Sequence, residues 1–189
     1  MIGTGARPRW MRASAEVDLD QLRCSIRPAI RSQVRGRLDR REIRRWARLA
    51  GLFVAVDKDG FFSMSRSASS ARRVLRIDSR PGRHTTALGR ALGYPLCCCL
   101  AAARRKDEGL DEWARAMSSR RFVGLFRLID PSGYVTGSAN ISHVPCSPCC
   151  SASLRMARAL GSESARSRGH NDWPVRRGRR PVPAARARV

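Results

Sequence analysis

Apolar residues near the start of the chain recur with the period of an α-helix. Over residues 38–50, Leu38, Ile43, Trp46 and Leu49 fall on one face, and arginines fill the other. Gly51 follows directly and is typical of a helix end. We therefore predict a helix over 38–50.

An earlier and weaker helical pattern follows Asp18, which suits the N-cap position. Leu19, Leu22, Ile26 and Ile30 would share one face of that helix. Pro28 interrupts the pattern, because proline cannot donate the backbone hydrogen bond of a helix interior.

The pattern then changes to that of β-strands. Two runs of strand-forming residues, 52–56 and 61–65, flank the polar turn 57–60 and predict a β-hairpin. The apolar residues of 74–77 fit a third strand, which would complete a small antiparallel sheet. They also fit a helix, and the sequence leaves this choice open.

From residue 84 onward the apolar spacing is helical. Thr85 or Thr86 is expected to cap a short helix that Gly93 ends, and Pro95 to open another over about 95–105. That second helix would carry three consecutive cysteines in its first turn.

The remaining pattern predicts a helix over about 110–119 and a last one that starts at Ser147 as N-cap and runs to about 160. Between them, 122–129 is a buried segment of undetermined type and 130–133 is a turn.

These elements predict one domain with a tail at each end. Residues 1–17 show no pattern and are expected to be a flexible arm. Residues 162–189 contain no Leu, Ile, Phe or Met, so they cannot bury enough apolar surface to offset the entropy of ordering, and we expect a disordered basic tail. Residues 18–161 form an α+β domain: helices with a hairpin or three-stranded sheet over 18–80, then a mainly helical cysteine-rich part over 84–161.

The net charge of +23 favours an acidic partner such as nucleic acid. All of the 38 basic residues except Lys58 and Lys106 are arginines, however, a bias that GC-rich coding DNA produces by itself. We therefore expect at most weak nucleic-acid binding.

No apolar run reaches the roughly 18 residues that would cross a bilayer, and the first residues lack the apolar core of a secretory signal. A cytoplasmic protein without membrane partners is expected.

Cysteine usage gives the clearest indication of chemistry. The chain has seven cysteines, an odd number, and three of them are consecutive at 97–99, which disfavours a disulfide framework. Neighbouring Cα atoms lie about 3.8 Å apart, below the separation of about 4.4–6.8 Å in ordinary disulfides. In a reducing compartment, clustered thiols indicate metal ligands or reactive groups.

Two stretches, 95–99 and 145–150, combine a helix-starting proline with thiols in or near the first turn. A helix start has unpaired backbone N–H groups and a partial positive charge, which favour thiolate over thiol. Thiolate both binds metals and attacks electrophiles, so both uses stay open.

Spacing selects ligands within the second stretch. Cys150 lies at i, i+4 and i+7 with Leu154 and Ala157, so it should face the core, whereas Cys149 should be turned away. A tetrahedral zinc site needs about four ligands, of which 143–150 can supply three. The fourth would be Cys97 or Cys98 from the other helix start, or both. We therefore predict one thiol and imidazole site with the candidate residues Cys97, Cys98, His143, Cys146 and Cys150.

The two stretches also match a known pattern. Leu92 to Cys98 read Leu-Gly-Tyr-Pro-x-Cys-Cys, and His143 to Cys150 read His-x-Pro-Cys-Ser-x-x-Cys. Over about residues 84–160 the chain resembles an uncharacterised prokaryotic family with this pattern. The resemblance implies that the five predicted site residues are the shared positions and that Cys99 and Cys149 are extras. It implies no reaction.

Three functions remain open. The first is a metal centre, with zinc expected over an iron–sulfur cluster because imidazole plus thiolates suits zinc. The second is a thiol-dependent enzyme with Cys97 or Cys98 as nucleophile or redox sulfur and His143 as its acid or base. The third is an arginine-rich nucleic-acid-binding module. Whether the protein is an enzyme is not determined, and the common nucleotide, hydrolase and protease motifs are missing.

Overall fold

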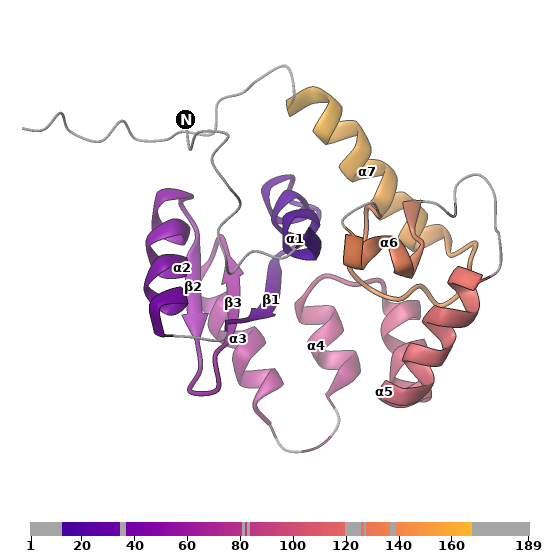
Figure 1. Cartoon of the computed structure of the whole chain (residues 1–189), viewed down its shortest axis with the longest axis horizontal. Helices are drawn as coiled ribbons and strands as arrows, with labels where there is room; N and C mark the ends of the chain where they lie inside the picture. The colour runs from indigo at the N-terminus through magenta and orange to yellow at the C-terminus, as the bar shows by residue number, and fades with distance from the viewer. Residues whose placement is uncertain are drawn as a thin grey trace, which may run out of the picture.

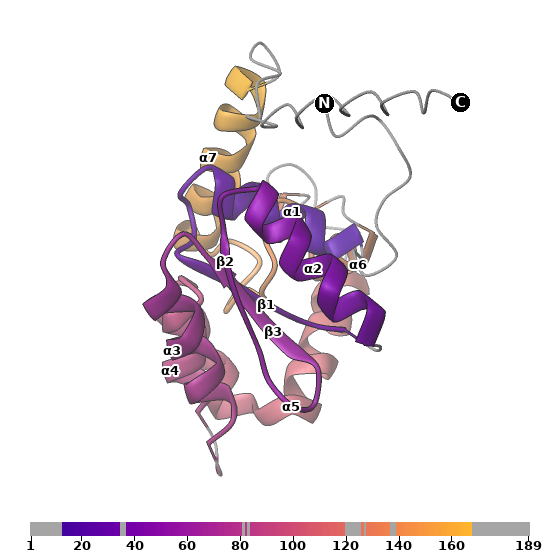
Figure 2. The same ribbon diagram turned by 90° about the vertical axis from the view of Figure 1, so that its left-hand side faces the viewer.

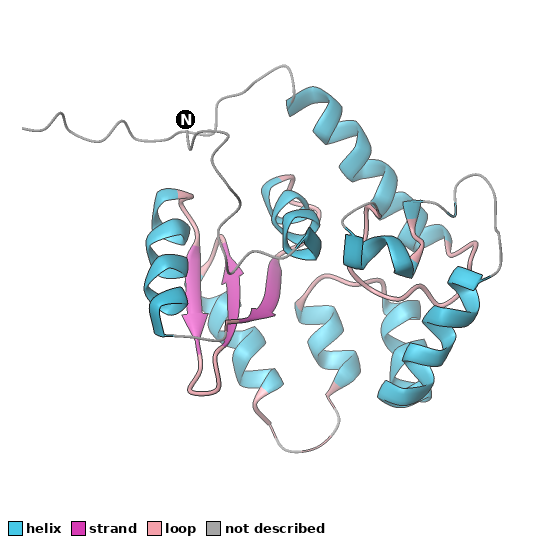
Figure 3. Cartoon of the chain, viewed as in Figure 1, coloured by secondary structure: helices cyan, strands magenta, loops and turns pink. Residues whose placement is uncertain are grey.

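The computed structural model describes residues 13–34, 37–80, 82, 84–119, 126, 128–136 and 139–167, and these form an α+β fold. A three-stranded antiparallel sheet is followed by a mainly helical half (Figures 1 and 3), which confirms the predicted fold class. The elements, in chain order, are α1 (Ala13–Arg23), β1 (Ala29–Gln33), α2 (Arg37–Leu49), β2 (Phe53–Val56), β3 (Phe61–Ser65), α3 (Ala68–Asp78), α4 (Thr85–Ala91), α5 (Leu96–Ser119), α6 (Pro131–Thr136) and α7 (Ser151–Ser167).

The predicted hairpin is present as β2 and β3. In its turn, the Asp57 carboxylate accepts hydrogen bonds from the backbone N–H groups of Asp59 and Phe61, both at 2.9 Å. Gly60 has a φ of 86°, and a Cβ there would lie 2.4 Å from the Val34 carbonyl oxygen. The turn therefore requires glycine.

The third strand comes from an unexpected place. It is β1, which pairs antiparallel with β3 and gives the strand order β1-β3-β2. The helix predicted beyond Asp18 is wrong in its second part: α1 ends at Arg23, and Ile30 pairs with Met64 in the sheet. Pro28 explains this, because it cannot continue a helix and disfavours helical geometry in the residue before it. Residues 74–77 are helical, within α3.

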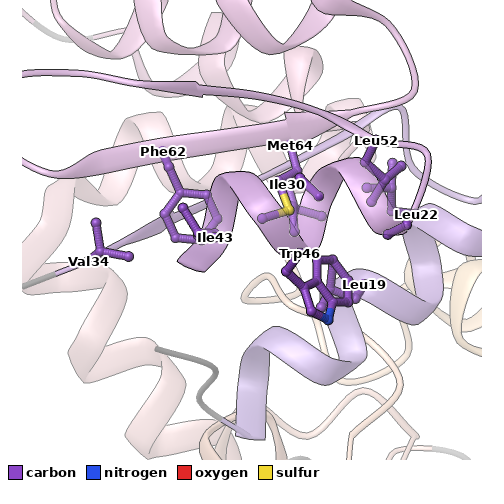
Figure 4. Packing of buried hydrophobic residues seen from close by; sticks show 11 residues of the cluster. Leu19, Leu22, Ile30, Val34, Ile43, Trp46, Leu52, Phe62 and Met64 are labelled. Carbon is purple, nitrogen blue, oxygen red and sulfur yellow. The ribbon is translucent and has the colours of Figure 1, made fainter. Parts of the chain in front are cut away.

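Helices cover both faces of the sheet (Figure 2). Helices α1 and α2 pack on one face, where Leu22, Ile43 and Met64 belong to a continuous apolar core (Figure 4). The predicted α2 stripe is right for Ile43 and Trp46, but Leu49 is 48% exposed. On the opposite face, the small buried residues Ala29, Ser63 and Ser65 allow α3 to approach closely.

The helical half starts close to the predicted positions. Helix α4 begins at Thr85 with His84 at its N-cap position, so the predicted threonine cap is wrong, and Gly93 ends it with a φ of 83°. Helix α5 joins the two predicted helices, 95–105 and 110–119, across a kink at Lys106 (φ 58°).

The last elements differ more from the prediction. The predicted turn 130–133 opens α6, where the Asp130 carboxylate accepts a hydrogen bond of 2.9 Å from the Ser132 N–H. Helix α7 begins at Ser151 rather than after Ser147 and continues to Ser167, into the segment expected to be disordered. Helix α1 likewise begins at Ala13, within the predicted arm.

Parts of the other predictions fall outside the described residues, namely 1–12, 168–189 and most of 122–129. Phe126 and Ile129 are buried, as expected for the segment 122–129. None of the described helices is long and apolar enough to span a bilayer.

A buried arginine ties the two halves together. Arg27 forms an ion pair with Asp18 of α1 and donates through Nε to the Leu92 carbonyl at 2.8 Å. It also donates to the Ser142 hydroxyl, and its guanidinium lies 4.5 Å from the centre of the Tyr94 ring. One side chain thus connects α1 with the chain on both sides of the cysteine-rich region.

We predict that Arg27→Leu lowers the free energy of unfolding by about 3–5 kcal/mol, because it removes the cationic partner of a buried carboxylate. The matched control, Arg23→Leu, removes an exposed ion pair with Asp20 and should cost no more than about 1 kcal/mol. Urea unfolding followed by circular dichroism measures both variants. Equal losses would contradict the structural role assigned to Arg27.

Candidate metal centre

The first pair of sulfurs extends from the start of α5. The Pro95 carbonyl accepts hydrogen bonds from the N–H groups of Cys98 and Cys99, both at 3.0 Å, so Pro95 occupies the N-cap position. Cys97 and Cys98 lie in the first turn of α5. The partial positive charge of a helix start therefore lies beside their sulfurs.

The second pair comes from the chain before α7. Leu154 donates to the Cys150 carbonyl at 2.9 Å, so Cys150 occupies the N-cap position of α7, directly before Ser151. Trp113 of α5 donates through Nε1 to the Pro145 carbonyl at 3.0 Å and holds the loop beside α5. Cys146 and Cys150 are thereby brought to the start of α5. Figure 1 shows α5 and α7 on the same side of the molecule, away from the sheet.

The structure brings four of the five predicted residues together. The sulfurs of Cys97, Cys98, Cys146 and Cys150 all lie within 4.8 Å of one another. The Cys150 sulfur lies 3.6 Å from that of Cys98 and 3.8 Å from that of Cys97, and the sulfurs of Cys97 and Cys98 are 3.9 Å apart.

These separations match a tetrahedron of sulfurs around one ion. A zinc–sulfur bond of about 2.3 Å implies sulfur–sulfur edges of about 3.8 Å in a regular tetrahedron. The three distances given above fall within a few tenths of an ångström of that value. With the Cys146 sulfur within 4.8 Å of the other three, the four thiols are compatible with binding a single metal ion.

Hydrogen-bond donors surround the buried sulfurs. The Ser153 hydroxyl lies 3.3 Å from the sulfurs of both Cys98 and Cys150. The backbone N–H of Cys146 donates to the Cys98 sulfur, and that of Ser153 donates to the Cys150 sulfur. Such donors stabilise negative charge on sulfur and orient the ligands.

The four thiols differ in acidity. Burial acts to raise the pKa of Cys150, but hydrogen bonds from Ser153, Cys146 and Cys98 outweigh it and lower the pKa to about 6. Burial is the main cause that raises the pKa of Cys98, and burial followed by the bond to Cys150 raises the pKa of Cys146 to about 11. The thiolate of Cys150 is therefore stabilised by hydrogen bonds from Ser153 and from the neighbouring thiols of Cys146 and Cys98.

The fifth predicted residue, His143, is not part of the four-sulfur group. Its Nε2 lies 2.9 Å from the Ser153 hydroxyl, and its ring lies 4.9 Å from the Tyr94 ring. Burial, followed by the charge of Arg27, lowers the pKa of His143 to about 3, so the imidazole is neutral. His143 reaches the sulfurs through Ser153, a residue that the sequence analysis missed. Its position three residues after Cys150, on the same helix face, was the available signal.

The other cysteines lie apart from this group. Cys99 is buried against α4, where a Cβ on Gly89 would lie 2.6 Å from its sulfur. Cys149 is exposed while Cys150 is buried, the orientation expected from their spacing to Leu154 and Ala157. Cys24 is half-buried near the end of α1.

We predict that the chelator-treated, reduced protein contains a thiolate that forms as the pH rises through about 6, measured by ultraviolet thiolate absorbance. This transition should disappear in Cys150→Ser. In Ser153→Ala it should move to higher pH, because a donor to the thiolate is lost. The matched control Cys149→Ser should retain it, and a transition that survives in Cys150→Ser would refute the assignment.

Comparisons of the chain with protein-family models, curated proteins and solved structures find no match. The conclusion about this site therefore comes from its own geometry: four cysteine sulfurs from two helix starts converge at metal-binding distance.

Proposed function

We propose that this protein binds one zinc ion through Cys97, Cys98, Cys146 and Cys150. The observation that carries the proposal is the convergence of four sulfurs within 4.8 Å, with the three edges among Cys97, Cys98 and Cys150 close to those of a zinc–sulfur tetrahedron. A set of four cysteines with no position left for water is typical of zinc sites that stabilise structure. The ion would join the start of α5 to the start of α7.

The donor set favours zinc over the alternatives. Zinc accepts four thiolates in a tetrahedron without any electronic preference for another geometry. An iron–sulfur cluster would place several iron and sulfide ions between its cysteines and would spread them more widely. The close approach of the Cys98 and Cys150 sulfurs supports a single ion.

The surroundings support a charged metal–thiolate centre. Zinc with four thiolates has a net charge of about −2, which must be offset when two of the sulfurs are buried. The first turn of α5, the Ser153 hydroxyl and two backbone N–H groups supply that compensation. His143 would act as an outer residue that orients Ser153.

A direct test is the metal content of protein purified under reducing conditions, by elemental analysis. We expect about one zinc per chain and no colour. Cys98→Ser should reduce the content strongly, whereas the exposed neighbour Cys149→Ser should leave it unchanged. Metal-free protein with freely reactive thiols would contradict the proposal, and a coloured protein containing iron would contradict zinc.

His143→Ala distinguishes an outer residue from a ligand. We expect the stoichiometry to be retained while zinc affinity falls about 10–100-fold, as when other outer hydrogen-bonding residues of metal sites are removed. Competition with a chromophoric chelator measures the affinity. Ser153→Ala should weaken binding similarly. Loss of stoichiometric zinc in the histidine variant, with an unchanged circular dichroism spectrum, would instead identify His143 as a ligand.

A thiol-dependent enzyme is the second candidate, and the lowered pKa of Cys150 favours it. In this case Cys150, rather than Cys97 or Cys98, would be the reactive sulfur. Metal-free protein whose Cys150 is alkylated rapidly near neutral pH would support it, whereas stoichiometric zinc that protects Cys150 from alkylation would contradict it.

A further inference from the structure

The four cysteines are unequally exposed. Cys98 and Cys150 are 3% and 5% exposed, whereas Cys97 is exposed and Cys146 is half-buried. A molecule that reaches the exposed side of the centre therefore meets Cys97 and Cys146 first. Cys98 also lines a separate cavity of about 580 Å³, together with Tyr94 and His143. A site with a purely structural role does not need an exposed ligand, because burial of all four would better protect the ion.

A groove of about 590 Å³ adjoins the exposed side. Cys97 and Cys146 line it, together with α5 residues of the next two turns: Leu100, Ala101, Arg104 and Arg105. Neither Cys98 nor Cys150 lines this groove, so it gives access to the two outer sulfurs alone.

The groove is positively charged. Cys97 and Arg104 are seven residues apart on α5, which places them on the same face two turns apart. Arg104 is exposed, and Arg105 is held by a hydrogen bond of 3.3 Å to the Ala101 carbonyl and by the Trp113 ring at 4.5 Å. No acidic residue lines the groove within the described chain. Two guanidinium groups therefore border the route to the exposed sulfurs.

We propose that this groove admits a small anionic chelating molecule, with thiolate or carboxylate groups, that takes the metal ion from the centre by ligand exchange starting at Cys97. The inference rests on the zinc centre proposed above and adds an exchange function to it. The two arginines attract the acceptor, and the exposed ligand is the one that it replaces.

The exchange involves no oxidation or reduction. A thiolate or carboxylate of the acceptor forms a bond to zinc while the zinc–Cys97 bond breaks, and the released Cys97 thiolate takes a proton from solvent. Cys146 follows, since it borders the same groove. Cys98 and Cys150 do not line this groove and are replaced last.

A second explanation for the position of the arginines is that they offset the negative charge of the metal–thiolate centre. The two roles predict opposite effects on rate. If Arg104 only offset charge, its removal would weaken metal binding and speed metal loss to any acceptor. If it attracts the acceptor, its removal slows transfer to an anionic acceptor and leaves an uncharged one unaffected.

The test uses the full chain loaded with cobalt, whose thiolate absorbance disappears as the metal leaves. Transfer to the anionic chelator EDTA and to the uncharged pyridyl chelator TPEN is followed for the parent protein and for Arg104→Gln. In Arg104→Gln we expect the rate of transfer to EDTA to fall severalfold and to lose much of its salt dependence. The rate of transfer to TPEN should stay unchanged. Arg104→Lys should keep most of the EDTA rate. The matched control is Arg115→Gln, on α5 but away from the groove, and it should match the parent.

Faster loss to both chelators in Arg104→Gln, or identical EDTA rates in that variant and the parent, overturns the inference. Metal content measured before each transfer reports on the centre itself. A filled site with rates independent of Arg104 therefore overturns the exchange function alone, whereas a chain that binds no metal overturns the zinc centre as well.

Discussion

The N-terminal ends of α5 and α7 lie close together, and the candidate metal centre depends on this arrangement. Each start brings thiols close to the partial positive charge of a helix N-terminus, and hydrogen bonds from Ser153 and neighbouring thiols stabilise the negative charge of Cys150. Four thiols within 4.8 Å of one another would gain little from packing alone, since cysteine makes only weak hydrogen bonds. A bound cation, as proposed above, would give the arrangement its physical reason.

Two apolar cores and a buried arginine hold the two helix starts in position. The sheet and its two layers of helices form a core of their own, centred on residues such as Ile30, Ile43 and Phe62. A second core, including Met117, Ile141 and Ala157, packs the loop before α7 against α5. Arg27 connects the two parts, since it contacts Asp18 in α1 and the Leu92 carbonyl and Ser142 hydroxyl next to the thiols. The centre would therefore form within an existing framework.

The unequal exposure of the sulfurs separates two tasks within one site. Cys98 and Cys150, with Ser153 and His143 behind them, form the buried side that orients the ligands. Cys97 and Cys146 form the side that faces the arginine-bordered groove. An ion held in this way would be retained by the inner pair and accessible through the outer pair.

Local patterns in the sequence determined the hairpin, α2, the start of α5 and the cysteine positions, because turn residues, helical periodicity and proline act over a few neighbouring residues. They did not determine that β1 completes the sheet, because its five residues gain their stability from pairing with β3, far along the chain. The same holds at the site. The sequence identified the thiols, but only tertiary packing placed Ser153 between His143 and the sulfurs and left Cys97 exposed, since side-chain direction and burial depend on contacts between segments distant in the chain.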